Sequence, residues 1–354
     1  MPAIDYRGRQ AVEISNGVLS LIVTVEGGHI ASVRHSAADV NPLWTPEWPT
    51  IEPSRFDAAV HTQFGAGAES RLLAGIFGHN LCLDLFGGPS GDEAAAGLGV
   101  HGESSVARYD IAATAADALT QTATFPGAGL AFRRDIWLVG DAAVVRETVT
   151  NLSPCDRPSA WTQHVSLGAP FVEPGATRFR VSATRSKVYE GDFGGEDAAQ
   201  VAGAEFDWPL CPSHDGGSID LRVYPGSARS AGYTAHLMDP AREQSFFTAW
   251  HPGFRLAFGY VWRRADFPWL GRWEENRSRQ LPPWNGREIT CGMEFGVSPM
   301  PESRRQMIER GSLFGVPGYR WLPAGRAVAV EYQLFARPAD APMESAAWDG
   351  GRVV

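Results

Sequence analysis

The sequence predicts an all-β protein, a large antiparallel β-sandwich with few short helices. Apolar residues alternate with polar ones over many short runs, turn residues separate these runs, and long helical periodicities are rare. With 39 glycines and 25 prolines in 354 residues, the chain has enough turn residues to join many strands. No fixed short repeat or linker divides the chain, so we expect residues 1–354 to form a single domain.

The predicted strands begin with two antiparallel meanders. In the first, residues 12–14 precede an Asn16-Gly17 hairpin turn, and 19–25 alternate before Gly27-Gly28 leads into 30–35. The second comprises three alternating runs between 119 and 151, separated by Pro-Gly and Gly-Asp turns. Further strands are expected at 178–189, 219–224, 232–238, 246–250 and 328–334, and one helix at 302–310, closed by Gly311.

Composition excludes several classes of partner and site. A net charge of −9 without a basic stripe disfavours nucleic acid and anionic membranes, since both are bound through Lys and Arg. The N-terminus has no apolar signal segment and no stretch is long enough to span a bilayer, so we expect a cytoplasmic protein. The four cysteines, which form no CxxC pair, indicate neither a zinc site nor a disulfide framework (Cys82, Cys155, Cys211 and Cys291).

One carboxylate has an unusual position within the run 289–301. If this run is a strand, Glu294 shares a face with Gly292 and Gly296, which leaves room for a ligand to approach it. The alternative is an exposed glutamate on an outer sheet face, with glycines that mark a bulge.

Two histidines are further candidates, one on a strand and one in a loop. His164 shares its strand face with Thr162, Ser166 and Gly168, so a second polar side chain lies among small residues. A lone strand histidine is more often structural than catalytic, and this alternative stays open. His101, at the end of a glycine-rich loop, offers a second imidazole.

Tryptophans concentrate in the run 258–276 and just outside it. Flat aromatic rings beside carboxylates suit sugars, which present C–H patches on their faces and hydroxyls at their edges. The alternative is that these rings fill the sandwich core. The loop 41–49 carries two more tryptophans, which either line a cleft or cover the core. The candidate binding residues of this region are Trp250, Trp262, Trp269, Trp273, Glu274 and Glu275.

No serine-hydrolase elbow, zincin motif, Walker lysine or cluster of metal-ligand spacing competes with these residues. At these residues the chain resembles the galactose mutarotase-like superfamily, the aldose 1-epimerases and their relatives. The resemblance is carried, in the family's order, by NGVLSLIVTVEGGHIASVRH, LGVHGE, TNLSPCDRPSAWTQHVSLGAPF, TCGMEFGVSP and RWLPAGRAVAVEYQLFARP. It implies a mutarotase-like supersandwich, a sugar ligand and no cofactor. It also implies that Glu294 is the general base, His164 the general acid and His101 a further imidazole that contacts the substrate.

The chain departs from the family pattern at several positions. Where aldose epimerases carry an Asn-Arg pair that holds sugar hydroxyls, the segment GIFGHNLCLDLF offers His79-Asn80 and no arginine. Gln163 stands where the family has Asn before its catalytic histidine, and only Glu274 or Glu275 could replace its substrate-binding aspartate. These departures argue against free galactose or glucose, and the missing arginine also against a sugar phosphate.

The resulting hypothesis is an isomerase that interconverts the anomers of an unidentified sugar by acid-base ring opening. Two alternatives remain on the same fold: a non-catalytic carbohydrate-binding protein, and a lyase or hydrolase variant. We predict that His164 and Glu294 converge on one open concave sheet face, near His101 and at least one of the candidate tryptophans, because the proton transfers depend on this convergence.

Overall fold

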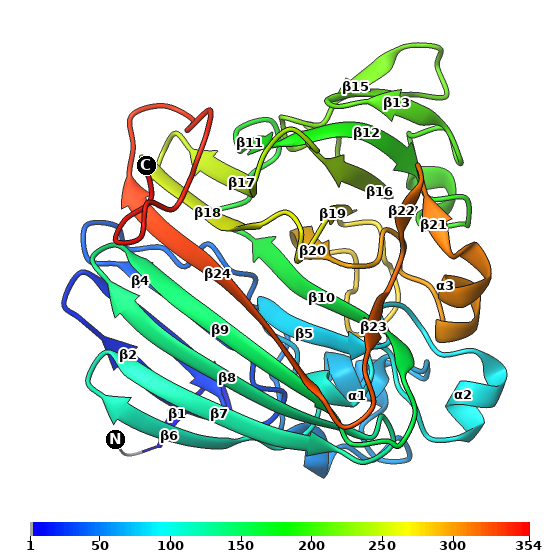
Figure 1. Cartoon of the computed structure of the whole chain (residues 1–354). Coiled ribbons are helices and arrows are strands. Elements are labelled where there is room, and N and C mark those ends of the chain that lie inside the picture. The colour runs from blue at the N-terminus through cyan, green and yellow to red at the C-terminus, as the bar shows by residue number, and fades with distance from the viewer. Residues whose placement is uncertain (1–2) are drawn as a thin grey trace.

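Two large antiparallel sheets make up most of the molecule, in a computed structural model that describes residues 3–354 (Figure 1). The first sheet contains, in spatial order, β1 (Ile4–Tyr6), β2 (Arg9–Ser15), β3 (Leu19–Thr24), β4 (Ile30–His35), β5 (His79–Asp84), β10 (Arg157–Gly168), β20 (Ile289–Gly296), β19 (Trp269–Asn276), β16 (Ser230–Met238), β12 (Ala183–Val188) and β13 (Glu205–Asp207), and β23 (Arg320–Leu322) pairs with β10. The second contains β11 (Arg178–Val181), β17 (Gln244–His251), β18 (Leu256–Arg263), β24 (Ala327–Pro338), β9 (Ala142–Asn151), β8 (Leu130–Val139), β7 (Ala118–Phe125) and β6 (Asp110–Ala115). The predicted all-β sandwich is therefore confirmed.

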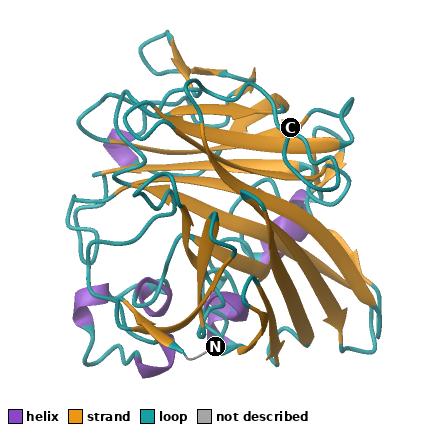
Figure 2. Cartoon of the chain, turned by 90° about the vertical axis from the view of Figure 1, so that its left-hand side faces the viewer, coloured by secondary structure: helices purple, strands orange, loops and turns teal. Residues whose placement is uncertain are grey.

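The remaining elements are short and lie around the sheets (Figure 2). Two small hairpins pair β14 (Leu210–Pro212) with β15 (Ser218–Asp220), and β21 (Ser312–Leu313) with β22 (Val316–Pro317). The helices are α1 (Ser70–Leu73), α2 (Gly91–Ala95) and α3 (Arg304–Arg310), with 3₁₀ turns η1 (Pro53–Arg55), η2 (Thr62–Phe64), η3 (Glu103–Ser105) and η4 (Gly195–Asp197). Within residues 3–354, no helix has the length and apolar character needed to cross a membrane.

Most strand predictions agree with the structure, and two need correction. The run predicted at 178–189 is two strands in different sheets, β11 and β12, because the chain crosses between the sheets at Ser182. The run predicted at 219–224 is strand only as far as Asp220, in a small hairpin. The predicted helix begins at Arg304, two residues later than expected, and the Ser303 side chain accepts a hydrogen bond from the backbone N–H of Gln306. It ends at Arg310, with Gly311 as its C-cap, as expected.

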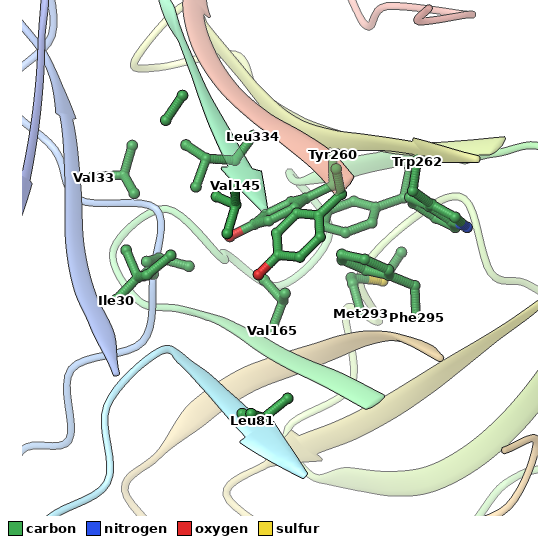
Figure 3. Packing of buried hydrophobic residues seen from close by; sticks show 14 of the residues in the cluster. Ile30, Val33, Leu81, Val145, Val165, Tyr260, Trp262, Met293, Phe295 and Leu334 are labelled. Atoms are coloured by element: carbon green, nitrogen blue, oxygen red, sulfur yellow. The ribbon is translucent and has the colours of Figure 1, made fainter. Parts of the chain in front are cut away.

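The core lies between the inner faces of the two sheets. Trp262 from the second sheet stacks on Phe295 from the first, with ring centroids 4.4 Å apart and planes 12° apart (Figure 3). Met293, Val165 and Leu81 pack in the same cluster, which also contains side chains of both meanders. The alternation of each strand therefore sends every second residue of β5, β10 and β20 into this core.

The outer face of the first sheet is covered as well, by loops and short helices instead of a sheet. Trp44 and Trp284 stack in parallel with centroids 5.4 Å apart, and Trp48 packs edge-on against both. The loop 41–49 was expected either to line a cleft or to cover the core. Trp44 lines a pocket, and Trp48 packs in an apolar cluster on this outer face, so each expectation holds for one tryptophan. This second apolar cluster surrounds the face toward which the candidate catalytic residues point.

Candidate active site

The candidate acid and base sit on adjacent strands. Strands β10 and β20 are antiparallel, and the pairs Thr162↔Gly296 and Ser166↔Gly292 place His164 opposite Glu294. His164 Nε2 and Glu294 Oε1 are 3.0 Å apart, and both side chains are almost completely buried. The predicted convergence of two residues 130 positions apart is confirmed as geometry, while their catalytic roles stay predictions.

The glycines beside Glu294 have a more local role than the sequence suggests. A Cβ at Gly292 would collide with Oε1 of Glu294, and one at Gly296 would collide with Thr162. The two glycines therefore make room for neighbouring side chains of the same sheet face. Glycine at 292 lets the Glu294 carboxylate lie close to the sheet, within reach of His164.

A second imidazole lies against the first. The ring centroids of His101 and His164 are 4.6 Å apart, and His101 adopts a left-handed backbone conformation with φ of 65°. Nδ1 of His101 lies 2.5 Å from the carbonyl oxygen of Phe86, so this nitrogen donates and Nε2 is the nitrogen free to accept. The loop thus fixes His101 at the candidate site, as the sequence predicted.

Burial changes the proton affinity of all three groups. Desolvation raises the pKa of the Glu294 carboxyl well above its usual value and lowers that of His164 well below it, with the charge of His101 adding to the second shift. Desolvation also lowers the pKa of His101 to about 4. Burial therefore favours a Glu294–His164 pair that shares one proton and carries no net charge.

The other ring nitrogen of His164 has polar neighbours on the same sheet face. Ser166 Oγ is 3.2 Å from Nδ1, and Nδ2 of Asn80 is 3.4 Å away across the β5–β10 pairing. A hydroxyl donates or accepts, so Ser166 can serve either protonation state of the imidazole. Asn80 thus contacts His164 from the neighbouring strand, on the same face of the sheet.

The pair lies in a pocket of about 260 Å³ with mostly apolar walls. The indole of Trp273 packs against the His164 ring, with centroids 6.0 Å apart. Glu294, His164 and His101 form the polar part of the wall at this end of the pocket. The apolar part of the wall comes from the sheet and from the loops that cover its outer face. Its residues are Trp44, Leu72, Leu73, Ile76, Phe86, Val100, Phe193, Tyr233, Trp273, Trp284 and Pro301.

The pocket also contains an arginine that the sequence did not single out. The guanidinium of Arg279 lies 4.7 Å from the ring of Trp284 and 5.5 Å from that of Trp273. It pairs with Glu69 at 3.3 Å and with Glu275 at 3.6 Å. Arg279 follows the tryptophan-rich strand within an irregular loop, and its position directly after Trp273–Asn276 was the only available signal.

Two polar candidates point away from the pocket, because they alternate with the site residues along their strands. His79 and Gln163 hydrogen-bond each other at 2.9 Å on the inner face, where the tyrosines of the second sheet are further partners of each. The expectation that they bind substrate is corrected: they belong to the core. Their sequence neighbours Asn80 and His164 occupy the pocket side.

Four other candidates also lie outside the pocket. Trp262 is in the core, and Trp250 lies on β17 of the second sheet, where its indole N–H donates to the carbonyl of Ala339. Trp269 is on the outer face but is covered by the β21–β22 hairpin, through a hydrogen bond to Pro317. Glu274 pairs with Arg272 at 2.8 Å, both buried. The alternative that these tryptophans fill apolar clusters therefore holds for Trp262 in the core and for Trp269 in the outer cluster, whereas Trp250 is half-buried and belongs to neither.

The remaining two candidates are close to the pocket. Trp273 lines it, as expected. Glu275 accepts hydrogen bonds from the backbone N–H groups of Ser278 and Arg279, so it fixes the loop that carries Arg279. Among the residues that the structure describes, no group of three or more His, Cys, Asp or Glu has the spacing of a metal site. The absence of a metal or cofactor stays a prediction.

Comparison with solved structures identifies the architecture. A candidate aldose 1-epimerase from Klebsiella pneumoniae superposes with a TM-score of 0.67 at 12% identity, over 94% of this chain and 80% of that one. A galactose mutarotase related enzyme from Lactobacillus acidophilus gives 0.60 at 12% identity, over 94% and 99% of the two chains. The chain has the galactose mutarotase-like fold.

A third protein of this fold supports the same assignment. A galactose mutarotase-like protein from Clostridium acetobutylicum superposes with a TM-score of 0.60 at 12% identity, over 95% of this chain and 98% of that one. No protein-family model and no curated protein matches the sequence itself. At such low identity the likeness extends to the mutarotase-like fold alone, so activity has to be argued from the site.

Proposed function

We propose that the protein is an aldose 1-epimerase-like isomerase that interconverts the anomers of a sugar by opening and closing its ring. One observation carries the proposal: an imidazole and a carboxylate 3.0 Å apart, buried in a pocket with aromatic walls. The anomeric hydroxyl and the ring oxygen of a sugar are bonded to the same carbon. An acid and a base that act on both therefore have to be neighbours, as these two side chains are.

The chemistry needs one proton on the pair. Glu294 as carboxylate removes the proton of the anomeric hydroxyl, while the imidazolium of His164 protonates the ring oxygen. The C1–O5 bond breaks, the C1–C2 bond rotates, and closure on the other face reverses both transfers. After ring opening the proton is on Glu294 and His164 is neutral, so the proton number of the pair is the same before and after. Burial favours the arrangement reached after ring opening, with the proton on Glu294 and His164 neutral, and the ion pair that starts the reaction carries the same single proton.

The surroundings suit a sugar in two further respects. His101 presents a free Nε2 beside His164 and can accept a hydrogen bond from a hydroxyl. The indole of Trp273 offers an apolar surface at the same point, on which the C–H face of a pyranose can pack. The proposed ligand therefore meets polar groups at its anomeric end and an aromatic wall beyond it.

Optical rotation tests the proposal. Freshly dissolved single anomers of hexoses, 6-deoxyhexoses, pentoses and uronic acids are followed with and without the purified protein. We expect at least one sugar to equilibrate faster than in buffer, and more slowly again when Glu294→Gln replaces the wild type. A panel on which the wild type accelerates nothing would contradict the isomerase.

A binding-only function is the second candidate. It is favoured by the absence, after Asn80 on β5, of the arginine that holds sugar hydroxyls in aldose epimerases. Calorimetry on the same panel separates the two functions. Binding of a sugar without faster equilibration, and with an affinity unchanged in Glu294→Gln, would favour a carbohydrate-binding protein.

A further inference from the structure

A second hollow adjoins the pocket of the candidate site. It measures about 610 Å³ and lies between η2 and the residues that precede α1 on one side, and the loop that follows Arg279 on the other. Neither the proton transfers nor the binding of a single sugar ring uses it. The two hollows share Glu69, Arg279 and Trp284 as lining residues, so these three side chains stand between them.

The partition between the hollows is made of side chains instead of backbone. Arg279 lies over the buried indole of Trp284 and pairs with Glu69 at 3.3 Å, and the two charged side chains are 33% and 40% exposed. An ion pair this exposed contributes little to stability, so it opens at low cost. A ligand bound at Glu294 can therefore extend past Arg279 into the second hollow.

The chemistry of the second hollow is largely apolar. Its walls include Ala58, Phe64, Ala66, Leu281 and Pro282. Leu281 is 78% exposed, the highest value among the large hydrophobic side chains that the structure describes. An apolar group that entered the hollow would bury this leucine, and the removal of its side chain from water favours binding.

We propose that the substrate is a reducing sugar that carries an apolar substituent away from its anomeric carbon, and that the second hollow binds this substituent. The inference rests on the proposed function for the placement of the anomeric end at Glu294 and His164. It adds a class of substrate: a sugar ether, ester or other derivative with an aryl or alkyl group at a hydroxyl remote from C1. Its apolar group crosses between Arg279 and Glu69, beside the indole of Trp284 that both hollows share.

Calorimetric titration tests this independently of turnover. The probes are D-glucose, D-galactose and D-mannose, the 6-O-benzyl and 4-O-benzyl ethers of each, and maltose as a polar substituent of similar size. We expect at least one benzyl ether to bind about tenfold tighter than its parent sugar, because a phenyl group leaves water. We expect maltose to gain less than this over D-glucose.

Two variants locate the binding of the benzyl group. Ala66→Trp fills the second hollow, and Leu281→Asp places a charge on its wall. Both positions are exposed and lie outside the pocket that contains Glu294. We expect each variant to remove the gain of the benzyl ether and to leave the affinity for the parent sugar unchanged.

Three results would overturn the proposal: no ether binds tighter than its parent, maltose gains as much as the ethers, or the gain survives in both variants. Failure of the proposed function would give a different result in these experiments. In that case the ethers bind tighter through the second hollow, but neither they nor the parent sugars equilibrate faster with the protein.

Discussion

The two faces of strand β10 place polar side chains in two different environments, the core and a pocket. On the inner face, Gln163 is enclosed by the core and bonded to His79, Glu147 and Tyr332. On the outer face, one residue further along, His164 meets Glu294 in a pocket. The same alternation separates His79 from Asn80 on β5. A shift of one residue along a strand thus changes a polar side chain from a core residue to a candidate site residue.

Two buried glutamates show what differs between the faces. Glu147 accepts hydrogen bonds from Arg134, Trp161, Gln163 and Tyr332, so each carboxylate oxygen is matched by donors. Glu294, among the described residues, has His164 as its ionic partner, and its side chain borders the pocket. A fully satisfied network fixes a core, whereas a carboxylate with open acceptor positions can act on a ligand.

The largest expected effect is on catalysis at the outer face. Glu294→Gln keeps the size of the side chain and removes the base, so kcat/KM for mutarotation should fall about 10²- to 10⁴-fold. The free energy of unfolding should not fall, because a neutral amide replaces a carboxyl group whose charged form burial already disfavours. Polarimetry and denaturant unfolding measure the two quantities. Unchanged activity in a folded variant would assign the chemistry elsewhere.

The inner face should respond in the opposite sense. Glu147→Ala leaves the buried guanidinium of Arg134 without its carboxylate, which should lower the free energy of unfolding by about 3–5 kcal/mol. Activity per folded molecule should change little, because Glu147 lies on the far side of the sheet from the pocket. Urea unfolding and polarimetry on the folded fraction provide the measurements. Full stability in this variant would show that the inner network is not structural.

A matched pair of tryptophan variants sharpens the comparison. Trp273→Ala removes an aromatic wall of the pocket and should raise KM about tenfold, the equivalent of about 1.4 kcal/mol. Trp262→Ala creates a cavity in the core and should lower stability by about 3–5 kcal/mol, with KM unchanged. Steady-state kinetics and thermal unfolding distinguish them. Equal effects on KM would remove the distinction between the two faces.

The smallest expected effect is on the shape of the pH profile. Two solvated side chains would give an active window between about 4.5 and 6.5, with Glu ionised and His protonated. In the buried pair the second proton is gained only well below 6.5, since burial lowers the pKa of His164. The shared proton is lost only well above 4.5, since burial raises that of Glu294. The acidic limb of the kcat/KM profile should therefore report His164 and the alkaline limb Glu294, the reverse of the solvated case. A His164 imidazole that is half-protonated at pH 6.5 by ¹⁵N NMR would contradict the buried pair.

Alternation within each strand predicted which small residues share a face with His164 and with Glu294. The convergence of the two side chains was expected from the family resemblance, because register between distant strands is not encoded in either strand alone. His79 was assigned to the site through a family motif, although the same alternation separates it from Asn80. Arg279 was missed because an irregular loop has no periodicity from which to infer a direction.

The central claim is tested most directly by NMR exchange between the two anomeric proton resonances of a sugar at equilibrium. With wild-type protein and a sugar selected by polarimetry, magnetisation should transfer between the α and β signals faster than in buffer. Glu294→Gln should abolish this transfer, and the inner-face variant His79→Gln should retain it. Equal transfer with wild type and Glu294→Gln, or loss of transfer only in His79→Gln, would contradict the assignment of the chemistry to the outer face.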